Sequence, residues 1–179
     1  ASTIALHKEA AGENWTKSGN FSFDVGDVHV TCIDSGSYTN WRSDSMRNWL
    51  EKDLASAGNK WKFVLMHVPP VYSAKTHAND GKLTQHLVPL FVKHKVNLLL
   101  TGHIHNYQRS KPFSINGSTI EVDKKFDGNT VRKTAWPICI VSGAGGAELY
   151  DQKVATNPGA WQPFTANFQA GYSFSIIDV

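Results

Sequence analysis

Three histidines of the chain have the spacing of a metal site. His103 and His105 stand two residues apart in the sequence Gly102-His103-Ile104-His105. Residues two apart in extended backbone point to the same side, so both imidazoles can converge on one centre. Gly102 lets the backbone turn there without a side chain in the way. Neutral imidazole suits iron and zinc equally, so these ligands do not select one metal.

The third histidine, His67, follows a short apolar run at residues 61–66, of the kind found in strands covered on both faces. A second such run, residues 96–101, ends just before the histidine pair. Apolar residues at helical spacing predict a helix near residues 83–94, which Pro89 should kink or split. This order predicts a βαβ unit with parallel strands. Ligands bind at the carboxyl ends of such strands, so we expect the three imidazoles at one sheet edge.

Each part of this pattern is weak alone. Eight histidines in 179 residues produce chance pairs, and many surface pairs bind nothing. The combination of the pair with His67, at the ends of two buried strands, favours a metal site over ordinary loop histidines.

The other elements follow from apolar patterns and turn residues. Alternating apolar residues on either side of a glycine-aspartate turn predict a β-hairpin over residues 21–34. Helical spacing over residues 43–58 predicts a helix, with a serine at its start and a glycine at its end as caps. After Asn106 the chain is rich in glycine and charge, which predicts loops before strands at residues 136–142 and 172–179.

At these residues the chain resembles the calcineurin-like metallophosphoesterases of the purple acid phosphatase type. Val64-Leu65-Met66-His67 is similar to the fourth signature of that family, and residues 102–107 are similar to the fifth, Gly-His-x-His followed by an aromatic residue. Further similar segments, in family order, are residues 21–30, 49–54, 89–92 and 141–146. The resemblance implies an α/β (α+β) fold, a four-layer α/β/β/α sandwich. Residues 1–179 would supply the C-terminal half of its catalytic domain.

The resemblance also implies a reaction and its cofactors. The family holds two metal ions, iron with zinc, manganese or iron, and a hydroxide that bridges them attacks phosphorus. His67 and His103 would bind one ion and His105 the other. Such a binuclear site generates a nucleophile near neutral pH and stabilises the attacking and leaving oxygens. We therefore expect a phosphohydrolase acting on phosphate monoesters, or alternatively diesters.

One departure from the family pattern limits this expectation. The first three signatures, which supply two aspartates, a tyrosine, an asparagine and a histidine, are missing from the sequence. Three histidines without the bridging carboxylate cannot hold two ions. We expect the missing N-terminal half to precede Ala1, either as a separate chain that stays associated or because this chain is a fragment. The chain alone should not be a competent enzyme.

Two further residues are candidates for substrate contact. His77 resembles a family histidine that binds phosphate or protonates the leaving group, although a solvated loop histidine is an equal alternative. Tyr107 could border the substrate pocket, but an aromatic residue beside a metal loop more often only packs.

Composition limits the partners and the location. The formal charge of +3 comes from scattered basic residues, which argues against binding long nucleic acid, and no apolar run is long enough to span a membrane. Glycosylation sequons begin at Asn14, Asn20 and Asn116 and favour a secreted glycoprotein. Cys32 and Cys139 lie in apolar runs, where free buried thiols are more frequent than a disulfide.

Two other functions remain open. A non-catalytic scaffold or binding domain could keep the fold with one metal or none, and a nucleotide phosphodiesterase or nuclease could use the same site. The N-terminal sequence would discriminate the scaffold from an enzyme, because only an enzyme needs the missing carboxylates.

Overall fold

The computed structural model describes residues 19–36, 39–77, 81–133 and 135–178. The predicted acceptor Asn14 lies outside these residues. The strands are β1 (Phe21–Val25), β2 (Val28–Ile33), β3 (Trp61–Met66), β4 (Leu98–Thr101), β5 (Tyr107–Ser110), β6 (Phe113–Asn116), β7 (Thr119–Val122), β8 (Ile138–Ser142) and β9 (Thr165–Gln169). The helices are α2 (Asp44–Ser56), α3 (Lys82–Lys93), the short α4 (Gln152–Ala155) and the 3₁₀ helix η2 (Pro158–Ala160).

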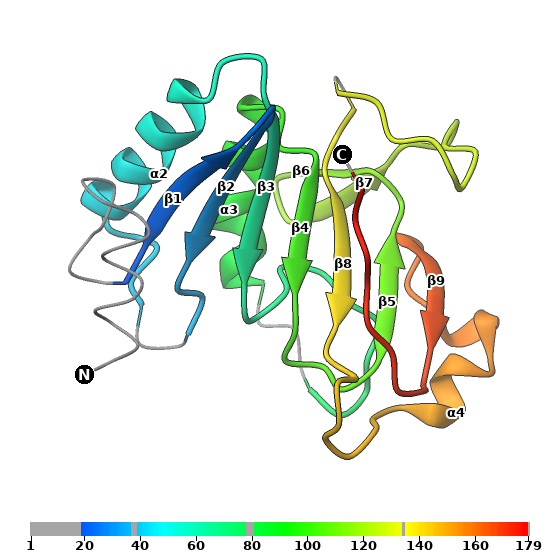
Figure 1. Cartoon of the computed structure of the whole chain (residues 1–179). Helices are drawn as coiled ribbons and strands as arrows, with labels where there is room; N and C mark the ends of the chain where they lie inside the picture. Colours follow the sequence, from blue (N-terminus) through cyan, green and yellow to red (C-terminus); the bar gives the residue numbers. More distant parts are fainter. Residues whose placement is uncertain (1–18, 37–38, 78–80, 134, 179) are drawn as a thin grey trace.

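One mixed sheet organises the fold, with strand order β1-β2-β3-β4-β8-β5-β9 (Figure 1). Strands β2, β3, β4 and β8 are parallel to one another, and β1, β5 and β9 complete the sheet through antiparallel pairs. The hairpin and the βαβ unit β3-α3-β4 are as predicted. The carboxyl ends of β3, β4 and β8 therefore meet at one edge.

Helix α3 is continuous from Lys82 to Lys93 although Pro89 lies inside it. The predicted split is therefore wrong. Pro89 lacks the N–H that would bond to the carbonyl four residues earlier, at Gln85, and its ring crowds that carbonyl, but these costs do not break the helix. Pro89 and Gln85 are both exposed, so water can satisfy that carbonyl.

The helices of the described residues are all too short or too polar to span a membrane.

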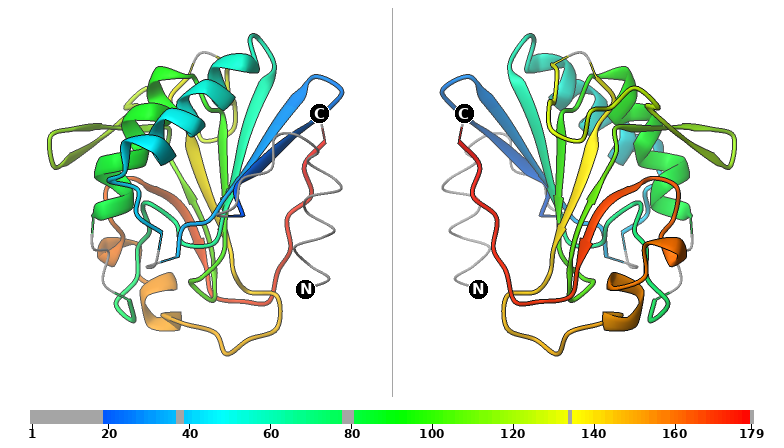
Figure 2. Two further views of the ribbon diagram at one scale, coloured as in Figure 1. Left: turned by 90° about the vertical axis from the view of Figure 1, so that its left-hand side faces the viewer. Right: turned by 90° about the vertical axis from the view of Figure 1, so that its right-hand side faces the viewer.

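Two predictions for the second half of the chain are also wrong. The stretch after Asn106 contains β5 and the β6-β7 hairpin rather than loops alone. Residues 172–178 form no strand, and β9 takes the outer place beside β5. The alternation of residues 172–178 is typical of a strand, but the segment lies over a sheet face instead of beside an edge (Figure 2). Its backbone makes an isolated bond from Ser173 N–H to the Ala144 carbonyl, 3.1 Å long.

The hydrophobic core lies between the sheet and helices α2 and α3, which cover one face (Figure 2). Leu50 of α2 and Phe91 of α3 are fully buried and belong to one cluster with Val64 of β3 and Leu99 of β4. Burial of each such side chain stabilises the fold by about 1.5–3 kcal/mol. This packing holds β3 and β4 firmly, so the residues that follow them start from fixed positions.

The opposite face of the sheet is apolar as well. The register pairs Leu65 with Leu100 and Leu100 with Ile140, so these three side chains form a row on that face. They are only partly buried. Residues 172–178 lie over this side, and Phe174 within them is 82% exposed. A second apolar layer is what such a face would pack against.

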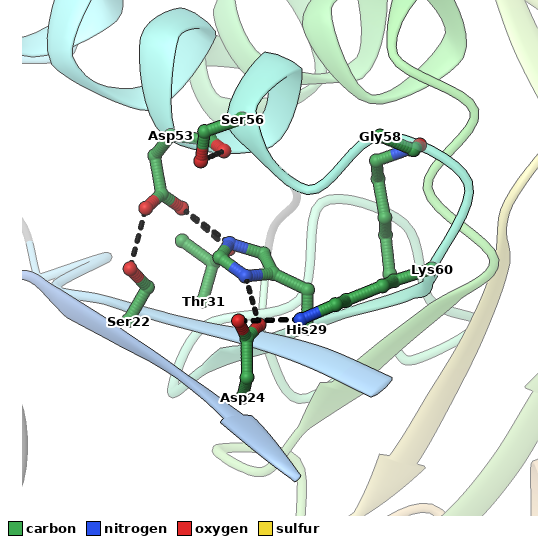
Figure 3. A network of polar contacts seen from close by, with 9 residues as sticks. Ser22, Asp24, His29, Thr31, Asp53, Ser56, Gly58 and Lys60 are labelled. Carbon is green, nitrogen blue, oxygen red and sulfur yellow. Dashed lines mark hydrogen bonds and ion pairs between the residues drawn. The ribbon is translucent and has the colours of Figure 1, made fainter. Parts of the chain in front are cut away.

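A polar network ties the first hairpin to α2 on the helix side of the sheet (Figure 3). Asp53 of α2 accepts hydrogen bonds from the hydroxyls of Ser22 and Thr31. The imidazole of His29 lies between Asp53 and Asp24. Burial lowers the pKa of His29, but its hydrogen bonds to Asp53 and Asp24 outweigh burial and raise the pKa above its ordinary value.

Both cysteines are free thiols, as predicted. Burial raises the pKa of Cys32 to about 11 and that of Cys139 to about 12. Thiols with such pKa values stay protonated at neutral pH and behave as small apolar side chains.

Candidate metal centre

His67 and Gly102 connect the ends of β3 and β4. The Gly102 N–H donates to the His67 carbonyl over 3.0 Å, which continues the ladder by one bond past the two strands. A Cβ atom at Gly102 would lie 3.6 Å from Nδ1 of His67, so the imidazole lies against this backbone. The His67 side chain is itself exposed at the edge. One side of the imidazole therefore packs on the Gly102 backbone, and the rest of the side chain is open to solvent.

His103 has a backbone conformation that is rare for residues other than glycine, with φ at +65°. Left-handed conformations in bulky residues persist where the surroundings hold them, and they are frequent at functional sites. The conformation brings the His103 ring to 5.2 Å from the His67 ring, centroid to centroid, at an interplanar angle of 72°. Two imidazoles at this separation can bind one ion.

The histidine pair lies on the connection from β4 to β5, residues 102–106, which passes as an arch over the end of β8. Strand β8 stands between β4 and β5 in the sheet, so the connection from β4 to β5 must cross it. Gly143 lies directly under the arch, where its N–H donates to the Asn106 carbonyl over 3.2 Å. A Cβ atom at Gly143 would lie 2.2 Å from the Ile104 carbonyl oxygen. Only glycine fits under the arch in this arrangement.

The imidazole of His105 is held by a backbone acceptor. Its Nδ1 lies 2.8 Å from the carbonyl oxygen of Glu148, which can only accept, so Nδ1 carries the proton. Nε2 is then the nitrogen with a free lone pair. The Tyr150 ring stacks on His105 at a centroid distance of 4.1 Å and an angle of 16°. His105 is thus prepared to bind an ion through Nε2.

The structure places His77 beside His103, with ring centroids 4.8 Å apart. Its ring also lies 5.3 Å from that of Tyr150, and its Nδ1 is buried without a hydrogen-bond partner among the described residues. Tyr107 lies farther along the arch at the start of β5, where it pairs with Ser142. Within the described residues, no ring contact joins Tyr107 to the histidines. Four predicted residues are therefore brought together and Tyr107 is not.

The electrostatics around His103 favour its neutral imidazole. Burial lowers the pKa of His103, and the neighbouring His77, His67 and His105 lower it further. A neutral imidazole has the lone pair that a metal ion requires.

These residues fit part of a metal centre. Three imidazoles, with one Nε2 freed by its Nδ1 hydrogen bond, suit iron or zinc. Among the described residues, however, no group of three or more His, Cys, Asp or Glu side chains could hold an ion by itself. The described residues therefore supply at most part of a ligand set.

Sequence patterns did not indicate three groups that shape the site: Tyr150, the Glu148 carbonyl and Gly143. Tyr150 and Glu148 lie about forty residues from the histidine they contact, and no spacing rule joins them. The glycine-rich stretch after β8 was a visible signal of close backbone approach, but it did not indicate which backbone approaches.

The structure also bears on the glycosylation acceptors. The Asn20 side chain is fully buried, and its Oδ1 accepts the Asp34 N–H over 2.7 Å, so a glycan at this predicted acceptor would require its surroundings to open. Asn116 is exposed at the end of β6 and stays a prediction.

Comparison with known proteins identifies the family. The family model described as Calcineurin-like phosphoesterase matches residues 6–107, which include His67, His103 and His105. The chain belongs to this family.

Several of the chain's relatives are named purple acid phosphatases. Purple acid phosphatase 21 of Arabidopsis thaliana is 37% identical over 97 residues, which cover 51% of this chain and 22% of that protein. A purple acid phosphatase of Glycine max is 31% identical over 174 residues, 89% of this chain and 34% of that protein. An acid phosphatase of Aspergillus ficuum is 33% identical over 118 residues, 64% of this chain and 17% of that protein. The chain thus spans well under half the length of these relatives.

Solved structures agree on the fold. A purple acid phosphatase from yellow lupin seeds superimposes with a TM-score of 0.64 at 22% identity, over 86% of this chain and 27% of that one. GAP50, described as the anchor in the inner membrane complex of Plasmodium, gives a TM-score of 0.55 at 14% identity, over 94% and 51%. The predicted metallophosphoesterase fold is confirmed.

Proposed function

We propose that this chain is the C-terminal half of a binuclear-metal phosphohydrolase that hydrolyses phosphate monoesters, with diesters as the alternative. One observation carries the proposal. His67 and His103, which follow two parallel strands, lie side by side at the carboxyl edge of the sheet, and His105 lies on the same arch with Nε2 free. Membership in a phosphoesterase family supplies the reaction class.

In this proposal His67 and His103 hold one ion and His105 holds the other, as iron with zinc, manganese or iron. The pair of ions, when bound, supplies an activated water and neutralises charge on the phosphate oxygens. The arch holds the imidazoles in place, so little reorganisation is needed when ions bind. His77, beside His103, binds a phosphate oxygen or gives a proton to the leaving group.

The remaining ligands belong to an N-terminal half, as an associated separate chain or as an earlier part of the same protein. Two observations support this assignment. The described residues hold no complete ligand set, and the face with Leu65, Leu100 and Ile140 is apolar but only partly covered. A second sheet packed on that face completes a four-layer sandwich and brings carboxylates to the histidine edge. A secreted location is also proposed, with Asn116 as an accessible acceptor.

The test uses the complete protein with its N-terminal half. We expect about two metal ions per assembly and hydrolysis of a chromogenic phosphate monoester. His103→Ala should abolish hydrolysis and remove at least one ion. His86→Ala, on α3 and away from the edge, is the matched control and should change neither quantity. Hydrolysis without bound metal, or an active His103→Ala variant, would contradict the proposal. Absence of both metal and hydrolysis would favour the scaffold alternative.

A further inference from the structure

The short segment from Glu148 to Tyr150 contacts His105 in three ways. The Glu148 carbonyl accepts the Nδ1 proton over 2.8 Å, the Tyr150 ring stacks on the imidazole at 4.1 Å, and the Tyr150 N–H donates to the His105 carbonyl over 3.0 Å. The contacts therefore involve the ring edge, the ring face and the backbone of one residue. No other histidine in the cluster has such a set among the described residues.

Tyr150 is itself anchored. Its side chain packs against the hydrophobic core, and the next residue, Asp151, accepts the Lys75 N–H through Oδ1 over 3.1 Å. This bond joins the segment to the loop that carries His77. The Tyr150 ring faces His77 as well, at 5.3 Å and an interplanar angle of 35°. One aromatic ring thus contacts both an imidazole predicted to hold metal and one predicted to meet substrate.

The hydrogen bond to Glu148 sets the tautomer of His105 but leaves freedom in the plane of the ring. An imidazole can swing about its bond to Cβ while a single hydrogen bond bends, since hydrogen bonds tolerate tens of degrees of misalignment. A parallel ring at 4.1 Å blocks that swing on one side. The combination fixes both which nitrogen is free and where its lone pair points.

We propose that Tyr150 is a positioning residue for His105: its ring sets the plane of the imidazole that presents Nε2 to metal and keeps it apart from His77. This inference rests on the proposed function, because it assigns His105 to a metal ion. The role requires the aromatic face and not the hydroxyl. Outer partners of metal-binding histidines commonly change metal affinity by about 10- to 100-fold when they are removed.

The experiment compares Tyr150→Phe and Tyr150→Leu in the complete protein loaded with Zn²⁺ alone. Competition with a chelator measures the two zinc affinities separately. We expect Tyr150→Phe to keep both affinities within about twofold, since the stack remains. Tyr150→Leu should weaken one zinc site by about 10- to 100-fold and leave the other unchanged. Zinc content after dialysis should fall from about two to about one per assembly.

A second variant controls for loss of stability. Trp161 packs on Phe168 behind α4, and its Nε1 donates to the Val154 carbonyl over 2.9 Å. Trp161→Leu removes an aromatic ring of this region without touching the cluster. It should lower the thermal unfolding temperature of the zinc-free protein but leave both zinc affinities intact. An effect of Tyr150→Leu through general destabilisation would appear in Trp161→Leu too.

The outcomes separate the two proposals. Wild-type protein that binds no zinc would overturn the proposed function. Wild-type protein that binds two zinc ions while Tyr150→Leu keeps both affinities would overturn only the role of Tyr150. Equal weakening in Tyr150→Phe and Tyr150→Leu would also overturn it, because the hydroxyl would then be the group that matters.

Discussion

His29 and Asp53 form an ion pair between β2 and α2, with His29 Nε2 at 3.1 Å from Asp53 Oδ2. The other ring nitrogen, Nδ1, lies 2.8 Å from Oδ1 of Asp24, which also binds Lys60. An ionised carboxylate can only accept hydrogen bonds, so a ring that bonds to two carboxylates must donate from both nitrogens. The geometry therefore favours the imidazolium, in agreement with the raised pKa of His29.

The first prediction is that stability decreases above neutral pH because His29 loses its proton. Its folded pKa exceeds its ordinary value of 6.5, so the stabilisation is complete below that pH and is lost as pH rises through the folded pKa. Asp24 affects stability at acid pH, because its hydrogen bonds with Lys60 and His29 lower its pKa. Its contribution is present above its ordinary pKa and is lost as pH falls through the folded value. Urea unfolding between pH 4 and pH 9 measures both limits.

His29→Gln tests the assignment. The variant leaves Asp53 buried without its cation, which should lower the free energy of unfolding at pH 6 by about 3 kcal/mol and flatten the decrease above neutral pH. His86→Gln, on α3, serves as control and should keep the wild-type slope above neutral pH, because burial lowers the pKa of His86 below its ordinary value and the residue is already neutral there. A slope that survives His29→Gln would mean that another group titrates.

The second prediction concerns the glycine under the histidine arch. In Gly143→Ala the new Cβ would lie 2.2 Å from the Ile104 carbonyl oxygen and 2.9 Å from its carbonyl carbon, so backbone must move. We expect a loss of about 3 kcal/mol or more in the free energy of unfolding. The displaced arch should also reduce metal content in the complete protein.

Gly145→Ala provides the matched control, since nothing lies within 4 Å of its added Cβ. It should change the free energy of unfolding by no more than about 0.5 kcal/mol. Normal stability and metal content in Gly143→Ala would contradict the close contact between Gly143 and the Ile104 carbonyl.

The third prediction separates His77 from the metal-binding histidines. His77→Asn should lower kcat by about 10²- to 10⁴-fold, the range for loss of a general acid, while the protein keeps both ions. His67→Asn should instead lose an ion. An unchanged kcat in His77→Asn would support the alternative of a solvated loop histidine, and loss of an ion would make His77 a ligand.

The strands that carry the site were predictable because their patterns are local. β3 is predicted with its bounds, since residues 61–66 are apolar except for Lys62 and are followed by a histidine and two prolines. β4 was found for the same reason. The βαβ rule then placed His67 and His103 at one edge, because the handedness and direction of such units vary little.

The parts that were missed depend on distant partners. β5 and β9 are short, and their own sequences do not indicate strands. They form strands because they pair with each other. Residues 172–178 have the alternation of a strand, but they lie over a face of the sheet. In that place only a layer outside the described residues could provide a strand to pair with them. Tyr150 reaches His105 because β8 returns the chain to the same edge. Local patterns carry no information about such returns.

The arch over β8 also leads to an expectation about how the chain folds. β3, α3 and β4 are consecutive and can assemble from contacts close in sequence, whereas β8 must enter from far along the chain to reach its place beside β4. In the folded chain the Ile104 carbonyl lies directly against Gly143, since a Cβ atom there would be 2.2 Å from its oxygen. We therefore expect His103 and His105 to reach their final positions late in folding, after β8 has joined the sheet.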